Sequence, residues 1–106
     1  MKIPKTIKIG GLVYKITFPK NKKEMKAKDK DGTYYYTDAK TDIDKQWIKF
    51  LFDKGVGKEY KELILFHELI HLLFYFSGTG EWDNEKEVHS FASMLYQVLK
   101  DNELIK

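Results

Sequence analysis

The residues whose types and spacing could carry out chemistry lie in one short segment, His67-Glu68-Leu69-Ile70-His71. Residues four apart on a helix share a face, with Cβ atoms about 5–6 Å apart, so both imidazoles can converge on one tetrahedral Zn²⁺. Glu68 would lie beside that metal and could take a proton from water whose pKa the metal lowers to about 7. The HExxH spacing therefore predicts zinc ligands at His67 and His71 and a peptidase general base at Glu68.

The surrounding segment, Leu63–Phe76, is apolar at every position except these three ionisable ones, with Tyr75 counted as apolar. A helix that is apolar on all sides is expected to be buried. Buried ionisable groups need partners, and one metal ion would serve both histidines. The alternative is a chance match in which a histidine and a glutamate only stabilise the core. Such a match is expected on the order of once in a hundred sequences of this composition.

A zinc site of this kind needs a third protein ligand. The histidine of the longer pattern HExxHxxGxxH is absent, so a carboxylate from the second predicted helix is expected, with Glu81, Glu85 and Glu87 as candidates. Glu85 borders the apolar face that includes Val88. Glu87 could instead be the capping-box partner of an Asn84 N-cap, and Glu81 falls in the predicted turn. Helical geometry favours Glu85 only modestly.

Residues 65–71 (LFHELIH) followed by residues 85–92 (EKEVHSFA) resemble the ImmA/IrrE-like metallopeptidases of bacteria, prophages and mobile elements. The pattern of that family is HExxH and then a helix reading E-x-x-A-N-x-F-A. Matching Phe91-Ala92 to its end implies that Glu85 is the zinc-binding glutamate, and Asn84-Glu85 also fits the wider gluzincin pattern N-E-x-x-S-D. The resemblance covers about residues 60 to 100. Ile70 replaces the usual glycine, and His89 replaces the usual Asn or Asp.

The resemblance implies a narrow-specificity intracellular endopeptidase that cuts a regulatory protein, for instance a repressor-type regulator. His89 would then hydrogen-bond to a ligand histidine, bind the metal itself or donate to the transition state. Tyr75 and Tyr96 are other candidate donors, although each is also a normal packing residue. The alternative function is a zinc-binding phage or mobile-element module that acts by protein–protein contact without proteolysis. Exposed aromatics at Tyr34–Tyr36 and the lysine run of residues 20–30 would suit a contact surface, although burial in a strand explains the tyrosines as well.

The pattern along the chain predicts an α+β fold: a small, mostly antiparallel sheet followed by two helices, zincin-like, in a single domain over residues 1–106. Gly10-Gly11 is expected to join the strands of an N-terminal hairpin. The predicted strands are Thr6–Ile9, Val13–Phe18, Thr33–Thr37 and Trp47–Phe52, and the predicted helices are Lys58–Ser77 and Asp83–Asp101. If Trp47–Phe52 lies at the sheet edge, it could pair with an extended peptide substrate.

Composition limits the other classes of function. The chain has no cysteine, which excludes disulfides and thiolate metal sites, and it has no signal or membrane segment, so a cytoplasmic location is expected. All 19 basic residues are lysine. Six of them fall in residues 20–30, a segment expected to be a solvated loop. A nucleic-acid partner is not expected, because arginine is absent and no aromatic or glycine-rich recognition pattern accompanies the lysines.

Overall fold

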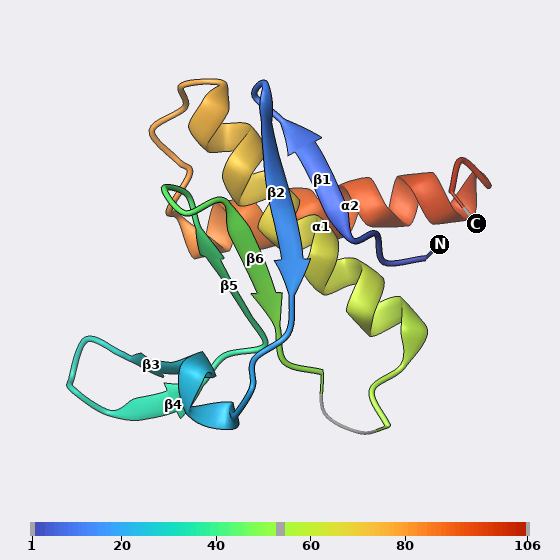
Figure 1. Cartoon of the computed structure of the whole chain (residues 1–106). Helices are drawn as coiled ribbons and strands as arrows, with labels where there is room; N and C mark the ends of the chain where they lie inside the picture. Colours follow the sequence, from blue (N-terminus) through green and yellow to red (C-terminus); the bar gives the residue numbers. More distant parts are fainter. Residues whose placement is uncertain (1, 53–54, 106) are drawn as a thin grey trace.

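The computed structural model describes residues 2–52 and 55–105, and its main sheet has four strands in the order β1-β2-β6-β5 (Figure 1). Strands β1 (Thr6–Ile9) and β2 (Leu12–Thr17) form an antiparallel hairpin. Strand β6 (Trp47–Phe50) runs parallel to β2, and β5 (Ala39–Asp42) pairs antiparallel with β6. The sheet is therefore mixed, and β5 is one of its two edge strands.

A second, two-stranded sheet projects beyond one end of the main sheet (Figure 1). It consists of β3 (Lys26–Lys28) and β4 (Tyr34–Tyr36), which pair antiparallel. A short 3₁₀ helix, η1 (Lys22–Met25), precedes it. We call residues 20–37 the arm. Its base is held to the main sheet by the Lys40 ammonium, which donates to the Lys26 carbonyl at 2.7 Å.

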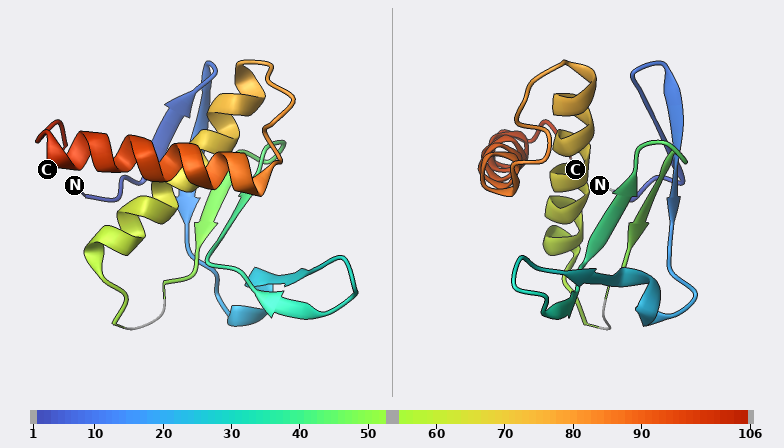
Figure 2. Two further views of the ribbon diagram at one scale, coloured as in Figure 1. Left: turned by 180° about the vertical axis from the view of Figure 1, so that it is seen from behind. Right: turned by 90° about the vertical axis from the view of Figure 1, so that its left-hand side faces the viewer.

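Helices α1 (Lys58–Phe76) and α2 (Glu85–Asp101) cover one side of the main sheet. Figure 2 shows three layers in its right-hand view: the sheet, then α1, then α2. Among the described residues, no helix covers the face of the sheet that points away from α1 (Figure 2). Within the described residues, neither helix is long and apolar enough to cross a membrane.

The core forms because successive side chains of each strand point to opposite faces of the sheet. Tyr14, Ile48 and Phe50 point from the sheet toward α1, where they pack with Leu65 and Leu72, and all five side chains are buried. A smaller cluster lies between the helices, where Ile70 packs against Val88 and Ala92.

The first hairpin turn meets the end of α1 closely. Gly10 has a φ of +59°, and a Cβ placed there would lie 2.6 Å from the Phe76 ring. Gly11 has a φ of +78° with nothing within 4 Å of such a Cβ. Glycine permits both the left-handed turn and this close contact.

The predicted α+β order of strands followed by two helices is confirmed. Three details differ. The predicted strand Thr33–Thr37 forms β4, which belongs to the arm and not to the main sheet. Its place in the main sheet is taken by β5, whose sequence AKTD has weak strand propensity and was not predicted. The expectation that Trp47–Phe52 could be an edge strand is wrong, because β6 lies between β2 and β5.

Candidate metal centre

Three of the predicted ligands meet at the junction of α1 and α2. The Glu85 carboxylate places Oε2 at 2.9 Å from Nε2 of His67 and Oε1 at 3.0 Å from Nε2 of His71. The two Nε2 atoms lie 3.2 Å apart. Their potential ligand atoms all lie within 4.8 Å of one another, and within the described part of the chain these residues form a group that could hold a metal ion.

The turn between the helices selects Glu85 from the three candidate glutamates. Asn84 caps α2, because its side-chain oxygen accepts the backbone N–H of Glu87 at 3.2 Å. Its side-chain amide donates to Glu81 at 2.6 Å, so Glu81 is held within the turn. Glu85 is the first residue of α2 and faces the histidines of α1. Glu87 is exposed and is not part of the metal-ligand group.

The backbone of the same turn orients one imidazole. Nδ1 of His71 lies 2.6 Å from the Trp82 carbonyl oxygen. A carbonyl only accepts, so Nδ1 carries the hydrogen, and in the neutral form of the ring Nε2 has a lone pair that a cation could take. Electron-pair donors from His67, His71 and Glu85 then converge on one point, an arrangement complementary to a cation. The donor set therefore fits zinc.

Burial shapes the acid–base behaviour of the neighbouring groups. Glu68 is only 7% exposed, and this burial raises the pKa of its carboxyl to about 7. The Thr41 hydroxyl donates to Glu68 Oε2 at 3.2 Å, which opposes part of that rise. Burial also lowers the pKa of His67, although Glu85 acts in the other direction. A bound cation would favour the ionised form of the carboxylate.

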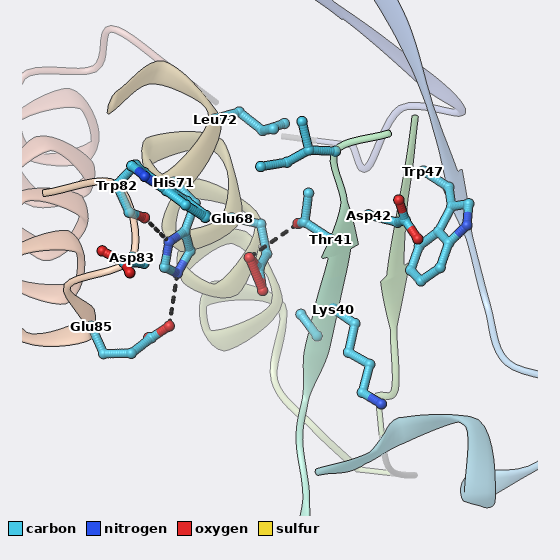
Figure 3. Close-up of a pocket in the computed structure, with 12 residues that line it drawn as sticks. Lys40, Thr41, Asp42, Trp47, Glu68, His71, Leu72, Trp82, Asp83 and Glu85 are labelled. Carbon is cyan, nitrogen blue, oxygen red and sulfur yellow. Dashed lines mark hydrogen bonds and ion pairs between the residues drawn. The ribbon is translucent and has the colours of Figure 1, made fainter. Parts of the chain in front are cut away.

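A cleft of about 350 Å³ opens beside these groups, between strand β5 and the two helices. In Figure 3, Lys40 and Thr41 of β5 form one wall, His71 and Glu85 form the other, and Glu68 lies between them. Its floor includes Leu72 and its rim includes Trp82. Glu68 therefore faces a space in which a substrate and the metal ligands can meet.

We compared the chain with protein-family models, curated proteins and solved structures. None matches. The assignment of the site therefore rests on its geometry.

The candidate donors from the sequence occupy different positions. His89 is exposed, and its ring lies 5.8 Å from the ring of His67, outside the group of metal-ligand atoms. Tyr75 packs against Trp82, with ring centroids 5.4 Å apart. Tyr96 packs against Phe66 at 5.5 Å. None of the three candidates lines the cleft.

Two contributors were missed by the sequence reasoning. Thr41 lies on an unpredicted strand, so nothing placed it opposite Glu68. Trp82 acts through its backbone carbonyl, which leaves no signal in the residue type. A search for β-branched residues that could form a strand after the tyrosines would have found Thr41; no comparable signal exists for Trp82.

Proposed function

We propose that this protein is a zinc-dependent metallopeptidase, in which His67, His71 and Glu85 hold the metal and Glu68 is the general base. The observation that carries the proposal is the convergence of three ligand side chains beside a buried carboxylate that faces a cleft. A merely structural pair of histidines would need neither the third donor nor the adjacent cleft. The resemblance to the ImmA/IrrE-like family supports the same assignment.

The chain's own residues would divide the chemistry as follows. A Zn²⁺ ion bound by the three ligands would supply a Lewis acid that polarises a substrate carbonyl and acidifies water. Glu68 accepts a proton from the attacking water and returns it to the leaving amine. Thr41 fixes the orientation of the Glu68 carboxylate by its hydrogen bond. The Trp82 carbonyl holds the His71 ring in the tautomer that a ligand needs.

The position of β5 suggests how a peptide would bind. Strand β5 lines the cleft, and only its β6 side is paired within the described part of the sheet. An extended peptide could add to its free edge as a further antiparallel or parallel strand. Its scissile bond would then cross the cleft close to Glu68. An unfolded or flexible segment of a regulatory protein, such as a repressor, is the substrate class that suits this geometry and the family resemblance.

Metal content tests the site, and proteolysis tests the function. Zinc would be measured by elemental analysis on wild type, His67→Ala and Glu85→Ala, with Glu87→Ala as the matched control on the same helical turn. We expect His67→Ala and Glu85→Ala to lose zinc, and wild type and Glu87→Ala to keep it. Unchanged zinc in both would remove the proposed centre.

Cleavage would be measured by mass spectrometry on a peptide library prepared from a bacterial proteome. We expect Glu68→Gln to keep the metal and lose cleavage, because the amide cannot accept the proton. Equal cleavage by Glu68→Gln and wild type would reject the peptidase mechanism. Zinc binding without any cleavage by wild type would favour the alternative, a zinc-bearing module that acts by protein contact.

A further inference from the structure

The arm brings lysines and tyrosines from separate parts of the sequence onto one surface. In the β3–β4 pairing, Lys26 lies opposite Tyr36 and Lys28 lies opposite Tyr34. Residues directly opposite each other in an antiparallel pair project from the same face. These four side chains therefore share one face of the arm, while Tyr35 and Ala27 project from the other. We call the first of these the Lys–Tyr face.

The tyrosine rings on this face are exposed and in contact with ammonium groups. Tyr34 is 58% exposed and Tyr36 is 49% exposed. The Lys26 ammonium lies 4.4 Å from the centroid of the Tyr34 ring, and the Lys22 ammonium lies 4.7 Å from that of Tyr36. Each exposed ring thus has an ammonium group over it. The two rings start from Cα atoms about 7 Å apart along the strand.

The carboxylates near the arm are already engaged. Glu24 pairs with Lys49 at 2.8 Å. Asp29 and Asp31 accept the backbone N–H of Thr33 in the turn between β3 and β4, at 2.9 and 3.1 Å. Backbone N–H groups do not cancel the charges of Asp29 and Asp31, but residues 20–37 contain six lysines and three acidic residues, so the formal charge of the arm stays positive.

The main sheet has a basic face of its own. The face of the sheet away from the helices carries Lys8 and Lys15, which the strand register places outward and which are both exposed. Trp47 is on the same face, opposite Lys15, and the Lys49 ammonium lies 4.6 Å from a Trp47 ring centroid. The Lys49–Glu24 ion pair joins this face to η1 in the arm. Asp42 is the acidic residue on this face, across from Trp47.

We propose that the Lys–Tyr face of the arm binds single-stranded nucleic acid. Lysine ammonium groups suit phosphates as point charges, and exposed rings on a basic surface are platforms on which unpaired bases stack. This proposal does not depend on the peptidase function, because it uses none of the residues of the metal centre.

The same observations favour a single strand over two other polyanions. In a duplex the bases are already stacked, so the tyrosine rings would have no free base to contact. Base edges in the major groove are read most often by arginine, which the chain lacks. An acidic protein segment would satisfy the lysines but would leave the exposed rings without a stacking partner.

Fluorescence anisotropy tests the proposal, with labelled oligo(dT) and oligo(rU) of about 20 nucleotides, longer than a typical site of this kind. We expect both to bind at low salt and to weaken as salt rises, because bound phosphates release counterions. Tyr34→Ala/Tyr36→Ala should weaken binding roughly tenfold or more. Tyr35→Ala is the matched control, since Tyr35 is 49% exposed but projects from the opposite face. It should change the affinity by less than about twofold.

A second pair of variants distinguishes binding by the Lys–Tyr face from attraction to the net positive charge of the chain. Lys26→Gln/Lys28→Gln should reduce the salt dependence of binding, by about 0.7 units of slope for each phosphate that a lysine no longer neutralises. Lys58→Gln/Lys86→Gln removes the same charge from the helices and should leave the slope unchanged. Glu68→Gln should bind like wild type, which keeps this test separate from that of the peptidase.

Several results would overturn the proposal. The first is failure of wild type to bind either oligonucleotide at low salt. The second is an equal loss of affinity in Tyr35→Ala and in Tyr34→Ala/Tyr36→Ala. The third is binding of a duplex of equal length, or of polyglutamate, that is tighter than binding of the single strands. If an arm variant does not fold, an NMR titration of the wild-type chain with oligo(dT) decides the matter. Shifts concentrated in residues 22–36 support the proposal, and shifts confined to the helices contradict it.

Discussion

The Thr41 hydroxyl on β5 donates a hydrogen bond of 3.2 Å to the Glu68 carboxylate on α1. The strand that forms one wall of the cleft therefore also orients the proposed general base. Because Glu68 is buried, solvent would not easily replace the Thr41 donor if it were removed. The edge strand β5 and helix α1 thus meet at the same carboxylate.

Replacing this hydroxyl should affect turnover more than metal binding. In Thr41→Val the shape of the side chain is kept but the donor is removed. We expect kcat to fall by about 10-fold or more, since hydrogen bonds to charged groups contribute about 1.5–3 kcal/mol. Zinc content should stay at the wild-type level. Thr41→Ser keeps the donor and should retain most of the activity; equal kcat in wild type and Thr41→Val would contradict the role of Thr41.

Zinc should stabilise the folded chain. A ligand at about 100 times its Kd adds about 2.7 kcal/mol to the free energy of unfolding, which corresponds to a rise in Tm of roughly 10 °C for a domain of this size. Chelation should reverse the rise. Differential scanning fluorimetry should show it in wild type and Glu87→Ala and not in His67→Ala or Glu85→Ala. A full shift in Glu85→Ala would mean that another residue completes the site.

The two glycines of the first hairpin should respond differently to alanine. Gly11→Ala adds only backbone strain, about 1–2 kcal/mol, because its φ is +78° and the surrounding space is open. Gly10→Ala adds the same strain and a clash with the Phe76 ring, so it should destabilise the fold by about 1–3 kcal/mol more. Urea unfolding measures both. Phe76→Leu should recover part of the stability in the Gly10→Ala background, and equal destabilisation by the two glycine variants would disprove the contact.

The arm should contribute a stabilisation that acid removes. The hydrogen bond from Lys49, followed by backbone N–H groups of Asn21 and Lys20, lowers the pKa of Glu24 to about 2 from its ordinary value of 4.5. A folded-state pKa below the unfolded value gives stability that is complete above about pH 4.5 and is lost as the pH falls toward about 2.

Thermal unfolding across this range tests the pH dependence. The Tm of wild type should exceed that of Glu24→Gln at neutral pH, and the difference should shrink as the pH falls toward 2. Lys49→Met removes the main cause of the low pKa of Glu24, so it should reduce the same pH-dependent gap. A difference in Tm that stays constant with pH would rule out the ionised Glu24 as its source.

The spacing of apolar residues was sufficient to predict both helices and the order of strands and helices along the chain. The apolar run around His67 and Glu68 predicted α1, and the spacing around Glu85 predicted α2, within two residues at each end. The HExxH spacing also predicted that His67 and His71 face the same point. These features depend on residues within one or two helical turns of each other, so they can be predicted from a single sequence.

The arrangement of the strands could not be predicted in the same way. The tyrosines of β4 have high strand propensity, but propensity does not say which strand they pair with. Strand β5 is short and polar, and it forms because β6 and α1 provide its partners. The parallel pairing of β2 with β6 joins residues about 30 positions apart, and no local pattern specifies it. The tyrosines and the lysine run were expected to suit a contact surface, but the sequence did not show that β3–β4 pairing places Lys26, Lys28, Tyr34 and Tyr36 on one face.

The arm also has an architectural consequence, because it leaves and re-enters the main sheet at the same end. Thr17, the last residue of β2, pairs with Lys49, and Ala39, the first residue of β5, pairs with Phe50. The departure and return points are therefore separated by two strand spacings, about 10 Å. A linker of a few residues could span that gap in place of the whole excursion. The main sheet and the two helices, with the proposed metal centre, would then form a shortened chain without the arm.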